Sequence, residues 1–298
     1  MDSPELSVVI PSVNGLSDLL GCLEAVERLR ASIRLEVLVV DRLGGDLPAT
    51  VRQRFPEVRV LSTGPDATIP QMRDRAFREV RGEAVAVIED HIIVPPGWGR
   101  QLLTALAEGH DVVGGPIENA ATNGLVDWAS FLCEYSACLP PLPTGVSDWL
   151  PGNNVVYRRA VLERYRSVTA EGGWENRLHD AIKSDGGGLW CRGDLIVGHK
   201  MHYTFGDYLS QRFLYARSYA GARVAGASPV RRFAYGAAAF LLPPLLLYRT
   251  LQRLSIKRVP RGLVARSLPL LGVFVCSWGL GEVVGYWFGA GDSLAKVR

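Results

Sequence analysis

Residues 84–98 read Ala84-Val-Ala-Val-Ile-Glu89-Asp90-His91-Ile-Ile-Val-Pro-Pro-Gly-Trp98 and are the most informative segment of the chain. Its apolar first part is typical of a buried strand, and the strand ends on two carboxylates and an imidazole. In open α/β sheets, ligands bind just beyond the carboxyl ends of the strands. Acidic side chains are almost never buried without a partner, so Glu89, Asp90 and His91 predict a site for a metal ion or a polar substrate.

Apolar runs alternate with helical patterns around this stretch. Strands are expected at 6–10, 35–40, 58–62, 84–88 and 111–113, and helices at 16–30, 47–54, 69–80 and 99–108. Such alternation is typical of βαβ units, so the predicted fold class is α/β, with a Rossmann-like, mostly parallel sheet and helices on both faces. The pattern then loosens into an α+β extension, with a helix at 125–138, a strand at 155–158, and helices at 159–165, 175–184 and 206–222.

Charge is distributed unevenly along the 298 residues. Residues 1–207 carry a net charge of −8, whereas 208–281 contain eleven Arg or Lys residues and no Asp or Glu. Two apolar runs, 240–248 and 268–288, lie in or next to this basic part. Basic residues interleaved with apolar runs favour an anionic membrane surface over nucleic acid, the other usual partner of a basic patch.

The second run, 268–288, is long enough for one bilayer span, which requires about 20 apolar residues. The apolar segment 233–248 is shorter and is interrupted at Pro243-Pro244, which favours a shallow, in-plane helix. The link 249–266 carries six Arg or Lys residues and is expected on the cytoplasmic side. The alternative is that both segments are buried helices of a soluble domain.

Cysteine usage and the first residues indicate the compartment. The five cysteines form no CxxC pair and no metal-binding spacing, which predicts ordinary thiols in a reducing environment. The first residues lack the basic and apolar regions of a signal peptide, so the catalytic part is expected in the cytoplasm. The predicted location is therefore the cytoplasmic face of the cell membrane.

The turn after the first expected strand is a second candidate binding site. It contains Pro11, Ser12 and Asn14 and precedes a helix, so polar side chains and backbone N–H groups are available to a phosphate or a base. The next strand ends at Asp41, an acid suited to a ribose or a base N–H. Helix capping explains Asp41 equally well when this residue is considered alone.

Taken in order, these segments resemble the family 2 glycosyltransferases of the GT-A fold. The first strand and its turn resemble the family's opening strand and nucleotide loop, and Asp41 matches the acid that ends its second strand. Residues 88–91 stand where the family has its Asp-x-Asp motif. Arg42 replaces the second acid that usually follows Asp41, which puts the usual nucleoside recognition in doubt. The resemblance runs from about Ser7 to Lys200.

Two further segments carry the resemblance. Residues 71–76, Gln-Met-Arg-Asp-Arg-Ala, occupy the place of the family's Ala-Arg-Asn-x-Gly segment, and residues 150–159 resemble the strand and helix start on the acceptor side. The resemblance implies nucleotide-sugar contacts from Pro11, Ser12, Asn14, Asp41, Arg73, Asp74, Glu89 and Asp90, and acceptor-side positions for Asn153, Asn154 and Trp174.

The metal motif departs from the family pattern, because it reads Glu89-Asp90-His91. The resemblance implies that Asp90 and His91 bind a divalent ion, Mn²⁺ or Mg²⁺; imidazole and carboxylate both suit Mn²⁺. A downstream histidine often completes the metal site in such enzymes. His199 is preferred to His202 for this role, and an ordinary surface histidine is the competing interpretation.

The resemblance also implies a catalytic base at Glu175. The family usually presents an acidic pair at the start of a helix facing the donor sugar, and Asn176 replaces the second acid here. His179, one helical turn later on the same face as Glu175, is the second catalytic candidate. The alternative is that Glu175 is only a favourable acid in a first helical turn. Trp174 is a candidate platform for a sugar or lipid, and packing explains it as well.

The resemblance implies an inverting transfer of a sugar from a nucleotide-sugar donor. Glu175 would deprotonate the acceptor hydroxyl, and the ion would neutralise the leaving nucleoside diphosphate. The membrane-associated tail implies a lipid, lipid-linked or other membrane-proximal acceptor.

The predicted segments are a GT-A catalytic domain over 1–205 (nucleotide-binding half 1–115, acceptor half 116–205), a basic amphipathic connecting helix over 206–232, and membrane-associated hydrophobic segments over 233–298.

Two other functions compete with this hypothesis. The first is a catalytically silent GT-A relative that binds a nucleotide-sugar or scaffolds a membrane complex, since Arg42 and Asn176 replace usual acids. The second, a nucleotidyltransferase, is disfavoured because no Gly-rich opening loop ends in Arg or Lys.

Overall fold

A computed structural model describes residues 3–297, and the chain forms two compact units. Unit 1 is Met1–Ala120 with Pro140–Lys200, and unit 2 is Ala121–Leu139 with Met201–Arg298. This division differs from the three expected segments, because a stretch from the middle of the chain groups with the C-terminal helices. Residues 1–2 and 298, at the ends of the expected segments, lie outside the described residues.

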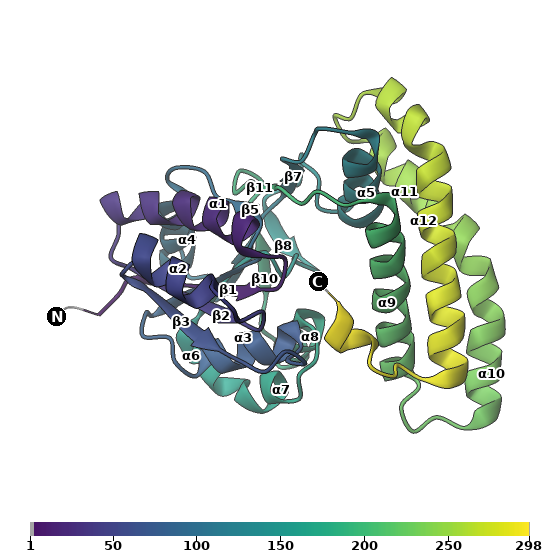
Figure 1. Cartoon of the computed structure of the whole chain (residues 1–298), viewed down its shortest axis with the longest axis horizontal. Helices are drawn as coiled ribbons and strands as arrows, with labels where there is room; N and C mark the ends of the chain where they lie inside the picture. The colour runs from purple at the N-terminus through teal and green to yellow at the C-terminus, as the bar shows by residue number, and fades with distance from the viewer. Residues whose placement is uncertain (1–2, 298) are drawn as a thin grey trace. The chain divides into compact units, whose positions relative to one another are not determined.

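Unit 1 is built on a large mixed sheet (Figure 1). Among the described residues its eight strands are β1 (Leu6–Ser12), β2 (Leu35–Asp41), β3 (Val58–Ser62), β4 (Ala84–Ile88), β6 (Val112–Gly114), β8 (Gly145–Ser147), β9 (Asn154–Arg158) and β10 (Leu189–Cys191), in the order β3-β2-β1-β4-β9-β6-β10-β8. Strands β1 to β4 pair in parallel, whereas β9 runs antiparallel between β4 and β6.

A smaller sheet adjoins the end of β4. It consists of β5 (Ile92–Ile93), β7 (Ile117–Asn119) and β11 (Val197–His199), in the order β5-β11-β7. β11 pairs antiparallel with β5 and parallel with β7. These strands have two or three residues each, too few to show an alternating pattern in the sequence, so they were not predicted.

Helices of unit 1 lie on both sides of the strands. They are α1 (Leu16–Glu27) with the 3₁₀ turn η1 (Arg28–Ala31), α2 (Leu47–Arg54), α3 (Ile69–Phe77), α4 (Trp98–Ala107), α6 (Arg159–Arg164), α7 (Arg166–Ala170) and α8 (Glu175–Ser184). Figure 1 shows α1 and α4 on one side and α6, α7 and α8 on the other. The predicted α/β fold is confirmed.

The sequence explains the central elements directly. β1 and β2 are buried along their whole lengths, as expected for central strands covered by helices on both faces, so each is a continuous apolar run with few exceptions. α3 begins with a capping box, in which Thr68 accepts from the Gln71 amide and Gln71 accepts from the Thr68 amide. This cap fixes the start of the helix that carries Arg73.

Unit 2 is helical. Its elements are α5 (Leu125–Tyr135), α9 (Phe205–Arg223), α10 (Pro229–Ala238), the 3₁₀ turn η2 (Ala239–Leu241), α11 (Leu242–Ser255), α12 (Arg261–Phe288) and the 3₁₀ turn η3 (Ser293–Lys296). Tyr208 of α9 and Phe274 of α12 pack with Ala129 of α5, which explains why α5 groups with the later helices. The helix expected at 206–222 is therefore α9.

Two helices of unit 2 are long and apolar enough to cross a membrane by length and composition: Pro229–Ser255, which joins α10, η2 and α11, and Arg261–Phe288. The first is longer than the expected 233–248 segment. Pro243 and Pro244 do not interrupt it, because they fall in the first turn of α11, where the missing N–H groups are not needed.

Candidate metal and donor site

The end of β4 and the short strand β11 bring two histidines together. His91 follows β4, and the next residues form β5, whose Ile92 pairs with His199 of β11. The Nε2 atoms of His91 and His199 lie 2.9 Å apart, and the rings meet edge to face with centroids 4.4 Å apart. Both side chains are buried. The geometry therefore joins His91 to His199, whereas His202 belongs to unit 2 and contacts Asp127.

A carboxylate completes this histidine pair. Glu89 places Oε2 3.4 Å from Nε2 of His91. Glu89, His91 and His199 each offer one ligand atom, and these three atoms lie within 4.8 Å of one another. This set of two imidazole nitrogens and one carboxylate oxygen is a candidate metal site.

Asp90 is buried and lies on the Nδ1 side of His91, outside the three-residue cluster. Its Oδ2 accepts hydrogen bonds from the backbone amides of Val13 and Asn14, at 2.7 and 2.9 Å. Its Oδ1 accepts from the Asn14 side-chain amide and lies 3.0 Å from Nδ1 of His91. Asp90 therefore fastens the turn after β1 to the end of β4 and orients the His91 ring.

That orientation leaves one nitrogen of His91 for a ligand. Nδ1 of His91 faces Asp90, and Nε2 faces His199 and Glu89; a ring with its proton on Nδ1 leaves the Nε2 lone pair for a ligand. Carboxylate–histidine contacts of this kind fix the tautomer of metal-binding histidines. Asp90 thus lies where it orients His91, and Glu89, rather than Asp90, belongs to the set of groups close enough together to hold one metal ion.

The three groups of the cluster shift one another's pKa values. Burial lowers the pKa of His91, but hydrogen bonds to Asp90 and Glu89 and their charges raise it to about 10. The pKa of His199 lies well below its usual value because the ring is buried and faces the charge on His91. Burial raises the pKa of Glu89, but the contact and charge of His91 together with Arg73 outweigh this and lower it to about 2.

The donor set fits a metal ion on distance as well. Two imidazole nitrogens that hold one ion at about 2.1 Å lie roughly 3 Å apart at the 90° ligand angle of an octahedral site, and roughly 3.4 Å apart at a tetrahedral one. The 2.9 Å between the nitrogens of His91 and His199 matches the first of these separations. Glu89 adds the negative charge that two neutral imidazoles lack.

Arg73 links the cluster to the candidate base. Its guanidinium lies 3.9 Å from Glu89 and donates a hydrogen bond of 2.9 Å to Oε2 of Glu175. Arg73 is buried, and Asn153 donates to Glu89 from the other direction at 2.8 Å. Residues that the sequence assigned separately to the nucleotide, acceptor and catalytic roles therefore form one connected network.

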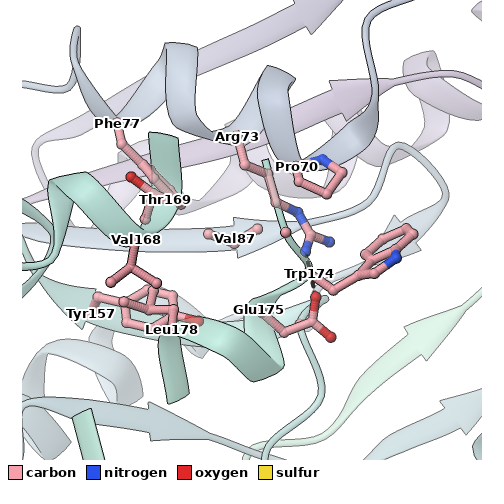
Figure 2. A pocket seen from close by; sticks show the side chains of 12 residues that line it. Pro70, Arg73, Phe77, Val87, Tyr157, Val168, Thr169, Trp174, Glu175 and Leu178 are labelled. Carbon is pink, nitrogen blue, oxygen red and sulfur yellow. Dashed lines mark hydrogen bonds and ion pairs between the residues drawn. The ribbon is translucent and has the colours of Figure 1, made fainter. Parts of the chain in front are cut away.

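Figure 2 shows the pocket beside Glu175. The pocket has a volume of about 30 Å³, and the Arg73–Glu175 pair lies beside Trp174 and Pro70, while apolar side chains line the opposite part. Gly152 also lines it, and a Cβ at Gly152 would lie 2.4–2.7 Å from atoms of the Glu175 side chain. The glycine thus makes room for the Glu175 carboxylate.

His179 of α8 is buried and contacts a tyrosine. Only 2 % of its surface is exposed, and its Nε2 lies 2.8 Å from the hydroxyl of Tyr157. Burial, opposed by the charge of Glu175, lowers the pKa of His179 to about 4, so the ring is neutral at physiological pH. The helical spacing did bring His179 onto the same helix face as Glu175, but its partner is Tyr157.

The other predicted residues lie in or near this region in different roles. Asp41 accepts from the amides of Leu43 and Gly44 and is buried at the end of β2. Asp74 binds Arg78 and the hydroxyl of Thr169, which connects α3 to α7.

Three further residues are buried or lie at an element boundary. Pro11 and Ser12 are buried in β1. Trp174 is the residue that precedes α8.

Asn154 has a structural position. Its amide donates to the carbonyl oxygens of Pro116 and Leu195, and its Oδ1 accepts from the Trp98 indole. It is fully buried and joins β9 to the loops that lead to β7 and β11. Through those loops it supports the position of His199.

Two residues beside Glu175 and His179 carry no recognisable signal in the sequence. Gly152 shapes the space around Glu175, and Tyr157 holds His179. A glycine carries no chemical signal of its own, and Tyr157 lies in an apolar strand where an aromatic residue is ordinary packing. Only the pairing of β9 with β4 places them beside α3 and α8.

Comparisons with known proteins agree with this architecture. Residues 7–166 match the family described as Glycosyl transferase family 2. No curated protein sequence matches the chain. Among solved structures, the chain resembles S. aureus TarS 1–349, with a TM-score of 0.50 and 15% identity over 71% of this chain and 64% of that one. The match thus spans less than two thirds of the TarS chain.

A second structure matches almost the whole chain. It is the mannosyltransferase PcManGT from Pyrobaculum calidifontis in complex with GDP-Man and Mn²⁺, with a TM-score of 0.51 and 16% identity over 97% of this chain and 86% of that one. The fold and the site thus define a glycosyltransferase of the GT-A class. The chain belongs to glycosyl transferase family 2.

Proposed function

We propose that this glycosyltransferase moves a sugar, with inversion, from a nucleoside-diphosphate sugar to a hydroxyl group of a membrane-proximal lipid or lipid-linked acceptor, and that it needs a divalent cation. The Glu89–His91–His199 cluster at the carboxyl end of β4 carries the proposal. Ligands of α/β sheets bind at this edge, and a cation there suits a diphosphate leaving group.

The cation proposed is Mn²⁺, held by Glu89, His91 and His199. Mg²⁺ prefers oxygen ligands, whereas two of the three donors are imidazole nitrogens. PcManGT, a relative in fold, was solved with GDP-Man and Mn²⁺. The bound ion supplies Lewis-acid stabilisation of the diphosphate that leaves. Asp90 supports this set by orienting His91, in place of the ligand role that the sequence suggested.

Glu175 is the proposed general base. Its side chain is about 19 % exposed and lies in the first turn of helix α8, beside Arg73. Arg73 pairs with Glu175 in this structure. A phosphate of the donor would compete with Glu175 for the Arg73 guanidinium. Release from Arg73 would let Glu175 accept the proton of the acceptor hydroxyl while that oxygen attacks the anomeric carbon. A single displacement of the nucleoside diphosphate at the anomeric carbon inverts the configuration of that carbon.

The turn after β1 is proposed to contact the donor through its side chains. The amides of Val13 and Asn14 already donate to Asp90. Arg73 is the proposed phosphate contact, and Asn153 and Trp174 border the side where the acceptor enters.

Membrane association is proposed from the two long apolar helices of unit 2. In their most apolar windows only 11% and 28% of the residues are buried within the chain, so these are not ordinary core helices. Lipid would cover the remaining apolar surface. This supports the membrane-associated segments and the lipid-type acceptor. The proposed location of the active site is the cytoplasmic face, where the basic link 249–266 is expected.

The test is nucleoside diphosphate release from a panel of UDP-, GDP- and dTDP-sugars with membrane lipid supplied, with Mn²⁺ or with chelator. The detergent-solubilised full chain is compared with Glu175→Gln and with Glu171→Gln, which changes an exposed acid paired to Arg177. Mn²⁺-dependent release that falls about 10²–10⁴-fold in Glu175→Gln alone would support the proposal. Donor binding without release, equal in all three proteins, would instead indicate the silent relative.

A further inference from the structure

A cavity of about 450 Å³ lies within unit 2, between α5, α9, α12 and the continuous helix from α10 to α11. Figure 1 shows α9, α12 and α10 running side by side. The cavity is far larger than the small pocket beside Glu175, and its size suits a small-molecule ligand. The proposed sugar transfer makes no use of it.

The cavity has an excess of positive charge. Four arginines and two glutamates line it: Arg212, Arg223, Arg249, Arg253, Glu134 and Glu282. Both glutamates already have arginine partners, since Arg223 lies 3.3 Å from Glu282 and Arg212 lies 3.9 Å from Glu134. Two positive charges are therefore left over.

These two charges belong to Arg249 and Arg253. Both are exposed, and within residues 3–297 neither side chain forms an ion pair or hydrogen bond. They lie four residues apart on α11, a spacing that brings two like charges onto one helix face and costs stability. An anion in the cavity would remove this repulsion.

Arg212 gives the cavity a rigid, buried donor. Its side chain is only 11 % exposed, and its guanidinium carbon lies 4.1 Å from the centre of the Trp278 ring. Its Nε atom is buried and has no hydrogen-bond partner among the described residues. A planar guanidinium held against an aromatic ring is suited to phosphate recognition.

Much of the rest of the lining is apolar or aromatic. Leu242, Leu246 and Val275 line the same cavity, and they belong to the two helices that are long and apolar enough to cross a membrane. Ionisable groups on such helices mark ligand sites. The ligand that matches both parts of the lining has an anionic head and a hydrocarbon chain.

We propose that this cavity binds a lipid whose headgroup is a phosphate monoester. The net charge of the lining is +2, which a monoester with close to two negative charges balances better than a singly charged diester. Arg249, Arg253 and Arg212 hold the phosphate, and the leucine side of the cavity holds the start of the chain. All the residues that line this cavity belong to unit 2.

The experiment measures binding of dioctanoyl phosphatidic acid to the detergent-solubilised full chain by calorimetry. The test variant is Arg249→Gln/Arg253→Gln, whose residues are exposed and unpaired, so the fold is retained. The matched control is Arg258→Gln/Arg261→Gln, which removes two exposed charges outside the cavity. Circular dichroism checks the folding of both variants.

We expect the test pair to weaken binding tenfold or more and the control pair to leave it within about twofold. Equal weakening by both pairs would show general charge attraction and would overturn the site. Dioctanoylglycerol binding as tightly as phosphatidic acid would overturn the phosphate assignment. Inorganic phosphate binding as tightly would assign the cavity to a free anion and overturn the lipid. None of these outcomes depends on turnover, so they are separable from the donor-panel result.

Discussion

The Nε2 atoms of His91 and His199 lie 2.9 Å apart although 108 residues separate them in the chain. Two neutral imidazoles whose Nδ1 atoms carry the proton would point their lone pairs at each other at this distance. A proton or a metal ion between them removes that repulsion, and Glu89 lies within reach of the same ion. The pairing of β5 with β11 creates this arrangement.

Removing either histidine is therefore expected to abolish tight Mn²⁺ binding. His199→Ala and His91→Ala should each weaken Mn²⁺ affinity by roughly 100-fold or more. Loss of a residue that only hydrogen-bonds to a metal ligand costs about 10–100-fold. Titration calorimetry or the Mn²⁺ paramagnetic resonance signal measures this. The control is His202→Ala in unit 2, and Mn²⁺ affinity reduced as much in His202→Ala would contradict the assignment.

Asp90 is expected to act on both stability and the metal. Asp90→Asn replaces one acceptor oxygen by a donor in a site where four donors converge, so the free energy of unfolding should fall by about 1–3 kcal/mol. Mn²⁺ affinity should fall by about 10–100-fold, because His91 loses its orienting carboxylate. Urea unfolding and calorimetry provide the two measurements. The control is Asp46→Asn, which changes an exposed acid outside the site and should alter neither the free energy of unfolding nor the Mn²⁺ affinity. If Asp90→Asn also left both quantities unchanged, the supporting role of Asp90 would be refuted.

Gly152 is expected to control the position of Glu175. The methyl group of Gly152→Ala would lie 2.4–2.7 Å from atoms of the Glu175 side chain, which must then move. The turnover rate should fall by about 10²-fold, since a small displacement of a catalytic group costs this much, while Mn²⁺ affinity stays unchanged. Gly188→Ala, whose added Cβ meets nothing within 4 Å, serves as the control in the same donor-release assay. Full turnover by Gly152→Ala would show that Glu175 is not the base.

His179 is expected to make stability depend on pH. Burial lowers its pKa to about 4, so the folded state favours the neutral ring. Its contribution is complete above the unfolded-state pKa near 6.5 and is lost as the pH falls toward 4, by up to about 3 kcal/mol. His179→Gln should flatten the fall in unfolding free energy between about pH 6.5 and pH 4. His110→Gln is the matched control, and identical pH profiles for His179→Gln and the native chain would contradict this role.

The sequence identified much of the α/β frame because its signals are local. Continuous apolar runs marked β1, β2 and β4, since central strands are covered on both faces. The polar residues after β4 marked the edge of the sheet that carries the candidate site, because ligands of α/β sheets bind beyond the carboxyl ends of the strands. The short strands β5 and β11 gave no such signal, and without their pairing the choice of His199 over His202 had no geometric basis.

The roles of single side chains depended on contacts that sequence spacing does not contain. Asp90 and Glu89 are adjacent in sequence, yet Asp90 turns inward to the amides of Val13 and Asn14, while Glu89 faces His91. The spacing of Glu175 and His179 predicted their common helix face correctly, but Tyr157 on another element determines what His179 contacts.

The amino-acid sequence was sufficient for the class of fold, the edge of the sheet that carries the candidate site, and the basic, apolar character of the C-terminal helices. These follow from hydrophobic periodicity and composition, which are properties of neighbouring residues. The tertiary structure alone decided which groups converge: the histidine pair, the Arg73–Glu175 contact, and the arginine-lined cavity of unit 2. Convergence depends on strand pairing and helix packing between distant segments, because side chains interact through space at distances of a few ångströms, whatever their separation along the chain.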